Sequence, residues 1–398
     1  MRTARTFVFP LFLFCLIPAL TGAQVYTIRD LGPLTPTAIN SWAQVVGNYN
    51  NHAYMWTRKG GMQDLGILQG GTFSGATGIN DLGAVTGTAD GPGTVISNDP
   101  NFSNEDCGDL IQPFIWTQRN GMQGLGSVTP PAGLVDFEDG GCADDGYYGA
   151  GINDVGQAVG YSTLYSTYQW ASLWTRAHGL TVFGGSWPPT FTNAISNTGK
   201  IVGQNSQDTI SPLTIFLGHA TSWQNGVAAD LGTLGGTADM GFPVGYSSSA
   251  NGVNDLGQIV GWSTTVPVVF QGGEGWYGPY PLHAILWPTS GGMRDLGTLP
   301  GDQFSTASKI NLFGQVIGVS GNANNLDSYN NTYQVIGRPF IWSERHGMRD
   351  LNTLIRRNHG WVLNSATDIN VWGQIVGMGT LNGQPHGFLL TPRDPFRP

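Results

Sequence analysis

A segment of one pattern returns seven times along this chain, and such an internal repeat constrains the fold more than any single residue does. In one copy, Ile152 leads into the turn sequence Asn153-Asp154-Val155-Gly156 and then into a short β-prone run that ends at Gly160. Turn residues between two such runs are typical of a β-hairpin. The seven copies centre on Ile39-Asn40, Ile79-Asn80, Ile152-Asn153, Ile195-Ser196, Val253-Asn254, Ile310-Asn311 and Ile369-Asn370.

Two further β-prone runs accompany each hairpin. One is an aromatic run such as Gln112-Pro113-Phe114-Ile115-Trp116, and the other is a closing run such as Gly292-Met293-Arg294-Asp295-Leu296-Gly297. In the last copy the aromatic run is apolar on both faces, so this strand must be covered on both sides. Four such runs in each repeat indicate a four-stranded propeller blade.

The two ends of the chain indicate how the blades close into a ring. The last copy stops after its aromatic run at Thr391, and the missing closing run is found at residues 25–32. We therefore predict an all-β fold, a seven-bladed β-propeller of four-stranded antiparallel blades closed by the N-terminal strand. The alternatives are an open β-stack, or a ring in which one degraded copy is not a full blade. The expected blades are 38–68, 76–128, 150–185, 194–234, 250–299, 307–354, and 366–391 with 25–34.

The combined pattern resembles the HAF-repeat family of bacterial extracellular proteins, which is named for His-Ala-Phe. The aromatic runs that carry the resemblance include His52-Ala53-Tyr54-Met55-Trp56 and His283-Ala284-Ile285-Leu286-Trp287. Ser172, Thr221 and Ile285 replace the middle aromatic residue in three copies. The resemblance covers nearly the whole chain and implies an exported repeat protein. It implies no particular reaction or ligand, and it assigns no catalytic residue.

The first residues indicate export. Arg2 and Arg5 precede an apolar run from Phe7 to Leu20, which is followed by small residues ending at Ala23. This pattern predicts a signal peptide over residues 1–23 and a secreted single-domain propeller over 24–398, with an uncleaved anchor as the alternative. No later stretch reaches the roughly 20 apolar residues of a membrane span.

The net charge of −9 argues against two classes of partner. A chain with few lysines and arginines cannot neutralise a row of phosphates, so nucleic acid and anionic membrane surfaces are not expected partners. We expect a monomer without an obligatory cofactor.

The long connections should share one rim of the disc. In a four-stranded meander, the second-to-third loops and the links to the next blade lie on the same side, and these segments vary most in length. Variable loops on a constant scaffold are where binding usually occurs. The aromatic residues in these segments are candidate binding residues, although they can instead order their own loops. They are Trp276, Tyr277, Tyr280, Trp187, Tyr147 and Tyr148.

Two long connections contain cysteines and many acidic residues. In an oxidising compartment, Cys107 and Cys142 are expected to form a disulfide. Carboxylates near them could bind calcium, with a solvated acidic surface as the alternative. The candidate calcium ligands are Asp136, Glu138, Asp139, Asp144 and Asp145.

The predicted function is a secreted binding or scaffolding module that engages extracellular glycan or protein through the long-loop face. One alternative is a carbohydrate-active enzyme, a glycosidase or lyase that uses loop carboxylates, and another is a structural surface component without a discrete site. No residue is predicted to be catalytic. The histidines that open four aromatic runs, and the aspartates of the closing runs, are expected to make structural hydrogen bonds.

Overall fold

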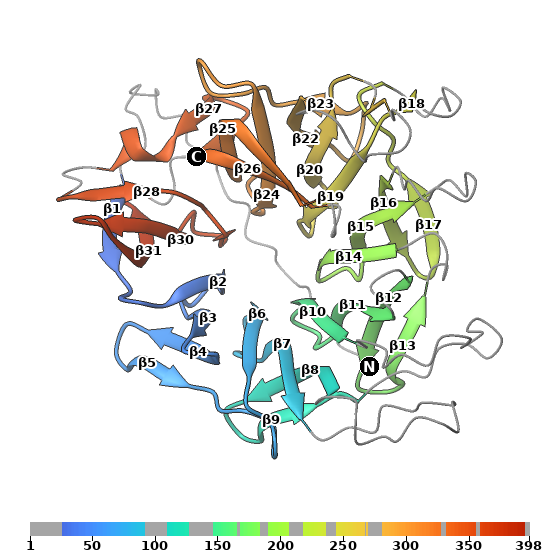
Figure 1. The fold of residues 1–398 in the computed structure, drawn as a ribbon, viewed down its shortest axis with the longest axis vertical. Coiled ribbons are helices and arrows are strands. Elements are labelled where there is room, and N and C mark those ends of the chain that lie inside the picture. The colour runs from blue at the N-terminus through green and yellow to red at the C-terminus, as the bar shows by residue number, and fades with distance from the viewer. Residues whose placement is uncertain are drawn as a thin grey trace, which may run out of the picture.

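The four runs of each repeat form four antiparallel strands, and seven such blades stand around a common axis (Figure 1). The computed structural model describes residues 26–91, 110–126, 146–164, 168–183, 190–206, 218–235, 244–266, 268–269, 281–327, 332–355 and 359–394. The first strands of blades 1 to 6 lie nearest the axis in Figure 1, and the later strands follow outward. The predicted all-β seven-bladed propeller is confirmed.

Blade 1 is formed by β2 (Thr35–Ile39), β3 (Val45–Tyr49), β4 (His52–Thr57) and β5 (Gly61–Asp64). Blade 2 is formed by β6 (Ser74–Ile79), β7 (Val85–Gly91), β8 (Leu110–Thr117) and β9 (Gly121–Gly124). Blade 3 is formed by β10 (Gly146–Ile152), β11 (Ala158–Leu164), β12 (Tyr168–Thr175) and β13 (Gly179–Phe183). Blade 4 is formed by β14 (Thr190–Ile195), β15 (Ile201–Ser206), β16 (Gly218–Gln224) and β17 (Val227–Asp230). Blade 5 is formed by β19 (Ser248–Val253), β20 (Ile259–Thr264), β22 (Leu282–Trp287) and β23 (Arg294–Asp295). Blade 6 is formed by β24 (Phe304–Ile310), β25 (Val316–Asp327), β26 (Thr332–Ser343) and β27 (Gly347–Asp350). Blade 7 is formed by β28 (Trp361–Leu363), β29 (Asp368–Ile369), β30 (Ile375–Leu381), β31 (Gln384–Pro392) and β1 (Tyr26–Asp30). The remaining elements are the strand pair β18 (Val244–Gly245) and β21 (Val268–Val269) and the short 3-10 helix η1 (Leu351–Leu354).

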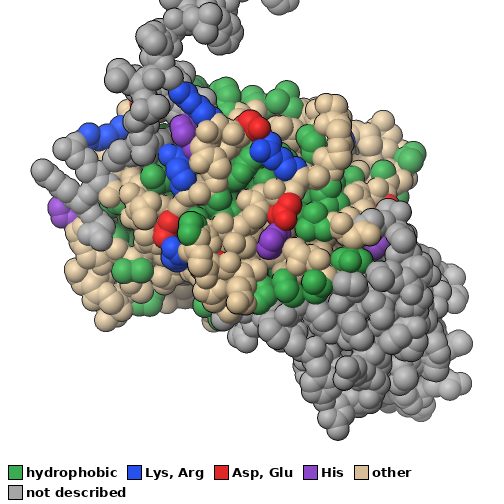
Figure 2. All heavy atoms as spheres, turned by 90° about the horizontal axis from the view of Figure 1, so that it is seen from above, with side chains coloured by type: hydrophobic (Ala, Val, Ile, Leu, Met, Phe, Trp, Pro, Cys, Tyr) green, Lys and Arg blue, Asp and Glu red, His purple; other side chains and the backbone are tan. Residues whose placement is uncertain are grey.

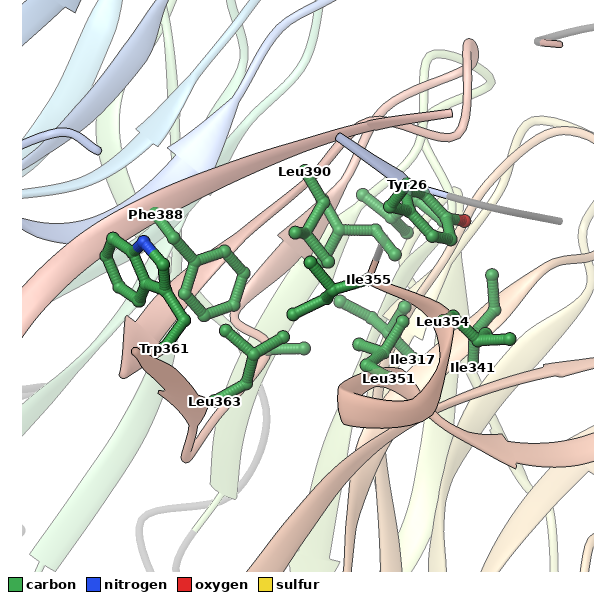
Figure 3. Close-up of a cluster of buried hydrophobic side chains, with 13 residues drawn as sticks. Tyr26, Ile317, Ile341, Leu351, Leu354, Ile355, Trp361, Leu363, Phe388 and Leu390 are labelled. Carbon is green, nitrogen blue, oxygen red and sulfur yellow. The ribbon is translucent and has the colours of Figure 1, made fainter. Parts of the chain in front are cut away.

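The N-terminal strand completes the last blade, as the sequence predicts. β1 pairs with β31 in antiparallel register from Tyr26↔Pro392 to Asp30↔Phe388. This pairing places Tyr26 and Leu390 in one apolar cluster with Leu351 and Leu354 of η1 (Figure 3). Both ends of the chain therefore contribute to the same buried core, so closure removes strand edges and apolar surface from water together.

The apolar core lies mainly between neighbouring blades. One cluster joins Val46 and Met55 of blade 1 to Val85 and Phe114 of blade 2, and another joins Leu286 of blade 5 to residues of blade 6. The aromatic strands are buried on both faces, as in β31, where Phe388, Leu389 and Leu390 are all buried. This burial explains why the third strand of each repeat is apolar without alternation.

The innermost strands carry a bulge that links adjacent blades. Thr37, Asn193, Asn251 and Thr367 occupy this position in four blades, where the strand register shifts or its ladder is interrupted. Each side chain donates to a backbone carbonyl of the following blade, at 2.9 to 3.1 Å. The extra residue of the bulge thus turns a polar side chain towards the neighbouring blade.

Blades 7 and 1 share a further polar contact beside the closure. The Asp368 carboxylate accepts hydrogen bonds from the backbone N–H groups of Ile39 and Ile369, both at 2.8 Å. Burial raises the pKa of Asp368, against the opposing effect of Lys309. Among the described residues, no helix is long and apolar enough to cross a membrane.

Replacing Tyr26 tests the contribution of the first strand to closure. We expect Tyr26→Ala to lower the free energy of unfolding by about 3 kcal/mol or more, because it empties a fully buried aromatic position. Tyr26→Phe should leave this free energy unchanged or slightly higher, since the hydroxyl is buried and has no hydrogen-bond partner within the described residues. Urea unfolding followed by circular dichroism measures both changes. A decrease in the free energy of unfolding of less than about 1 kcal/mol for Tyr26→Ala would contradict the contribution of this strand to closure.

Candidate binding surface

A buried asparagine organises the turn between the first and second strands of six blades. In blade 6, Oδ1 of Asn311 accepts the backbone N–H groups of Phe313 (3.1 Å) and Gln315 (3.0 Å). Its Nδ2 donates to Gln315 Oε1 at 2.7 Å and to the carbonyl of Asn370 in blade 7 at 3.1 Å. The fourth turn residue takes a positive φ and is glycine in six blades, whereas Ala43 takes φ 58° in blade 1. One side chain therefore fixes both its own turn and the neighbouring blade.

These asparagines form a ring of inter-blade hydrogen bonds around the axis. Each Nδ2 donates to the carbonyl of the equivalent residue in the next blade: Asn40 to Asn80 (3.1 Å), Asn80 to Asn153 (2.9 Å), Asn153 to Ser196 (3.0 Å), Asn254 to Asn311 (2.9 Å), Asn311 to Asn370 (3.1 Å) and Asn370 to Asn40 (3.0 Å). Ser196 of blade 4 has no side-chain amide, so the equivalent hydrogen bond to the carbonyl of Asn254 is not made. We call this arrangement the asparagine ring.

The second residue of the turn adds another set of inter-blade bonds. The backbone N–H of Ser41 donates to Asp81 Oδ1 (2.8 Å), and that of Asp81 donates to Asp154 Oδ1 (2.7 Å). Asn197 links the next blades, because its side chain accepts from the Asp154 N–H and its own N–H donates to Asp255 Oδ1. These carboxylates thus hold the turns of blades 1 to 5 against one another.

The third residue of the same turn is apolar and exposed in six of the seven blades. We call the six side chains the crown: Trp42, Leu82, Val155, Leu256, Phe313 and Trp372. Trp42 is 76% exposed and Leu82 is 79% exposed, whereas most large apolar side chains of the described blades are buried. With Leu312, these turns supply half of the large apolar side chains that are exposed in the described part of the chain. Apolar groups gathered on one face in this way are characteristic of an interaction surface.

Two tryptophans of the crown are held against the next blade. Trp372 Nε1 donates to the Ser41 carbonyl and Trp42 Nε1 donates to the Asp81 carbonyl, both at 2.9 Å. Their backbone N–H groups donate to Oδ1 of Asn370 and Asn40, at 3.1 Å in both turns. Each tryptophan is therefore held at two points, one on its backbone and one on its indole, so a ligand would immobilise little that is not already fixed.

The third-to-fourth turns lie on the same face, further from the axis. This placement follows from the register, in which Val45 pairs with Trp56 and Trp56 pairs with Met62. These outer turns carry exposed basic residues, namely Arg58, Lys59, Arg119, Arg176 and Arg345. On the edge of the disc in Figure 2, charged side chains of both signs are scattered among polar and apolar ones. In this view no large patch of a single charge is visible.

The opposite face carries the recurring histidines, which pair with the recurring aspartates. The distances from His Nδ1 to the carboxylate are 2.9 Å for His52–Asp64, 3.0 Å for His219–Asp230, 2.8 Å for His283–Asp295 and 2.8 Å for His386–Asp30. Each aspartate also accepts the backbone N–H of the glycine two residues later. The expected structural hydrogen bonds are confirmed.

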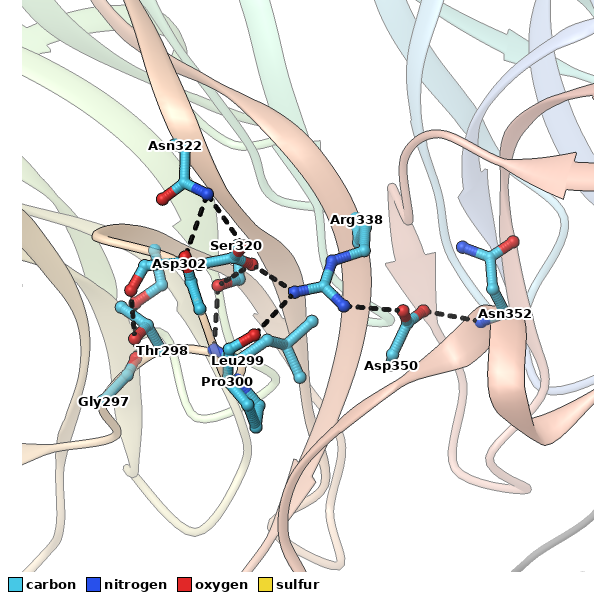
Figure 4. A network of polar contacts seen from close by, with 12 residues as sticks. Gly297, Thr298, Leu299, Pro300, Asp302, Ser320, Asn322, Arg338, Asp350 and Asn352 are labelled. Carbon is cyan, nitrogen blue, oxygen red and sulfur yellow. Dashed lines mark hydrogen bonds and ion pairs between the residues drawn. The ribbon is translucent and has the colours of Figure 1, made fainter.

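Arg338 replaces the histidine in blade 6 and links a wider network (Figure 4). Its guanidinium donates to Asp350 at 3.3 Å and to Asp302 at 2.9 Å. Asp302 also accepts the Ser320 hydroxyl at 2.9 Å, and Asp350 caps η1 through the Asn352 N–H at 2.8 Å. These carboxylates are therefore engaged in structural contacts.

Most residues predicted to form sites fall outside the described part of the chain. Trp276, Tyr277, Tyr280 and Trp187 lie there, as do Asp136, Glu138, Asp139, Asp144, Asp145, Cys107 and Cys142. The loop-face site, the calcium site and the Cys107–Cys142 pairing stay predictions. No described residue is a cysteine, so there is no disulfide among them, and they contain no group of three or more potential metal-ligating side chains.

The remaining two candidate residues lie in β10. The backbone of Tyr147 is part of this strand. The Tyr148 ring stacks on Tyr161 with centroids 5.2 Å apart, and Tyr161 meets Phe191 edge-on at 5.4 Å. Tyr148 therefore has one ring partner in the adjacent strand while 37% of the residue stays exposed, and its binding role remains a prediction.

Sequence reasoning missed the crown although its signal was present. The third position of the turn is apolar in six copies, five of them Asn-x-x-Gly and one Asn-x-x-Ala, at a place where a solvated turn would ordinarily carry polar residues. Variation in loop length, by contrast, indicates the opposite face.

Comparisons with known proteins agree on the fold alone. The β-propeller domain of the trilobed protease from Pyrococcus furiosus matches with a TM-score of 0.51 and 10% identity, over 93% of this chain and 94% of that chain. Virginiamycin B lyase from Staphylococcus aureus has a TM-score of 0.49 and 10% identity, over 92% and 99%. The sialidase of Trypanosoma rangeli has a TM-score of 0.33 and 10% identity, over 92% and 55%.

No protein-family model matches the sequence, and no curated protein matches it. The likeness to the protease propeller domain, at 10% identity, concerns the fold alone, and a shared fold does not establish a shared function.

The asparagine ring can be tested by changing one member and by filling its gap. Asn311→Ala removes four hydrogen bonds from a buried site, so we expect it to lower the free energy of unfolding by about 2 kcal/mol or more. Ser196→Asn should raise this free energy by up to about 1 kcal/mol, because the amide can then reach the Asn254 carbonyl. Urea denaturation measures both. Equal stability of Asn311→Ala and the unaltered chain would contradict the role of the ring.

The histidine–aspartate pairs predict a loss of stability in acid. Partial burial raises the pKa of Asp64, Asp230 and Asp295, but hydrogen bonds from their histidines and glycine N–H groups outweigh it, so each pKa lies below the ordinary value. A lowered carboxylate pKa stabilises the fold above the unfolded value, about 3.9, and this contribution is lost as the pH falls through the folded value. We therefore expect stability to decrease below about pH 4.5.

Unfolding free energies measured between pH 6 and pH 2.5 test this expectation. The variant Asp64→Asn/Asp230→Asn/Asp295→Asn should be less stable at pH 6 and show a shallower decrease in acid. An acid limb of unchanged slope in the variant would exclude these pairs as its source.

Proposed function

We propose that this chain is an exported propeller of the HAF-repeat kind that acts as a binding or scaffolding module for an extracellular glycan or protein. The sevenfold repeat with its aromatic runs, three of which begin with His-Ala, together with the signal-peptide pattern at residues 1–23, supports the family and the location. Low identity to the solved propellers leaves the function to be argued from the surface.

The observation that carries the proposal is the crown. Its side chains project from turns that the asparagine ring fixes, and several are more than half exposed. Exposed apolar groups on a rigid frame bind with little loss of conformational entropy. The polar groups of the opposite rim that are described here, in contrast, are engaged in contacts within the fold. The crown is therefore a binding surface in addition to the predicted long-loop face.

The carbohydrate-active enzyme is the alternative function. Asp154 and Asp255 both accept hydrogen bonds from the Asn197 amide, at 2.8 and 3.0 Å, so two carboxylates are close together. Each also accepts a backbone N–H of a neighbouring turn, and neither is buried. A general acid needs a raised pKa, which an apolar, water-excluding site usually supplies. This environment favours a structural role for the pair.

A comparison of variants on the two faces tests the binding function. The mature protein is labelled and its binding to bacterial envelope fractions, which contain both protein and polysaccharide, is measured before and after protease treatment. We expect Trp42→Ser/Leu256→Ser to reduce binding at least tenfold, because about 1.4 kcal/mol or more of apolar contact is lost. The variant Trp276→Ala/Tyr277→Ala reports on the long-loop face.

Two controls complete the experiment. Circular dichroism should show that both variants keep the fold, and sedimentation velocity should show an unchanged assembly state. Absence of binding, or binding that neither variant reduces, would contradict a binding role for either face.

A further inference from the structure

Aromatic side chains occupy one part of the crown only. Phe313, Trp372 and Trp42 belong to blades 6, 7 and 1, which are consecutive around the ring, whereas the other members are Leu82, Val155 and Leu256. We call the three aromatic residues the arc. A surface that merely excluded water would not require flat rings on three adjacent turns, so the arc points to a ligand that is recognised by stacking.

The two indole N–H groups of the arc are already engaged within the fold. Each Nε1 already donates to a backbone carbonyl of the next blade, at 2.9 Å. Trp42 is 76% exposed and Trp372 is 43% exposed in spite of these bonds. The part of each ring that remains accessible is therefore carbon, held in a fixed orientation.

Each of these indoles is hydrogen-bonded to the backbone of a polar residue. Trp372 contacts the turn that carries the Ser41 hydroxyl, and Trp42 contacts the turn that carries the Asp81 carboxylate. Asp81 Oδ1 accepts the Ser41 N–H, while its Oδ2 makes no hydrogen bond within the described residues. An apolar plane next to an anionic acceptor matches a sugar ring, which has a face of C–H groups and an edge of hydroxyl donors.

The charges of the arc select among sugars. The turns 40–44, 311–315 and 370–374 contain no lysine or arginine, and the nearest turn in blade 2 adds the Asp81 carboxylate. An acidic sugar would be repelled by this carboxylate and would find no cation in these turns, whereas a neutral sugar can donate a hydroxyl to it. The basic residues of the outer turns belong to the periphery of the face.

We propose that the arc binds a neutral oligosaccharide, with sugar rings stacked on Trp372 and Trp42, a further contact at Phe313 and a hydroxyl hydrogen-bonded to Asp81. This inference rests on the proposed binding function and names the ligand class and the site. It places glycan recognition on the short-turn face, opposite the predicted loop site.

The experiment uses the mature protein and purified hexasaccharides in isothermal titration calorimetry. The neutral probes are cellohexaose, laminarihexaose, xylohexaose and chitohexaose, and the acidic probe is hexagalacturonate. We expect at least one neutral probe to saturate and hexagalacturonate not to bind. Trp42→Ala and Trp372→Ala should each weaken binding about tenfold, and Asp81→Asn should weaken it by a smaller factor.

Matched variants separate stacking from simple loss of apolar surface. Leu82→Ala and Leu256→Ala change the same turn position outside the arc, so we expect less than about a twofold effect on saccharide binding. Trp42→Phe keeps an aromatic face and should retain most of the affinity lost in Trp42→Ala. Thermal melts confirm that the variants are folded.

The possible failures are distinguishable. If no neutral probe binds, or if Leu256→Ala weakens binding as much as Trp42→Ala does, the saccharide inference is wrong. If, in addition, crown-dependent binding to the envelope fractions is protease-sensitive, the partner is a protein and the binding function stands. Binding of hexagalacturonate as tight as that of the neutral probes would also overturn the inference.

Discussion

The hydrogen bond from a buried asparagine amide to the backbone of the next blade is the contact on which the rest of this structure depends. Blades of a propeller touch most closely near the axis, where the polar backbone of the turns must be satisfied without much water. An asparagine can accept two N–H groups of its own turn and donate to the adjacent blade, so one residue type satisfies several requirements at once. Leucine or alanine at Asn311 would remove these hydrogen bonds to the N–H groups of Phe313 and Gln315 and to the carbonyl of Asn370.

The same repeat is used differently on the two faces. On the long-loop side, His52 and its counterparts hold the aspartates that cap the closing strands. On the short-turn side, the polar side chains of the first two turn residues make inter-blade hydrogen bonds, and the side chain of the third turn residue is exposed to solvent. Near the axis, the exposed apolar surface of the described short-turn face therefore comes largely from one residue in each of six blades. Trp42 and Leu82 can differ there because the backbone N–H of each is bound by the asparagine of its own turn.

The fold could be predicted from the sequence because it depends on the number of repeats and on the number of β-prone runs in each. Seven copies, four runs in each and a missing run supplied by residues 25–32 together determine a closed ring. The candidate site could not be predicted in the same way, since exposure of Trp42 or Phe313 depends on how the turn is oriented at the rim. Loop-length variation favours Trp276 and Tyr277 as binding residues, whereas the turns of the crown vary in side chain and not in length. The inter-blade role of Asn197, which joins two carboxylates, also requires the register of neighbouring blades.

In the turns that carry the crown, the residue that bonds to the next blade and the residue that faces solvent are different. The backbone N–H of Trp42, Leu82, Phe313 and Trp372 is held by the preceding asparagine, whatever side chain follows. The turn can therefore carry different side chains at these positions, although replacing Trp42 or Trp372 also removes an inter-blade hydrogen bond of the indole. A single substitution at one of these positions can therefore change which ligand the surface binds while the backbone of the propeller stays the same.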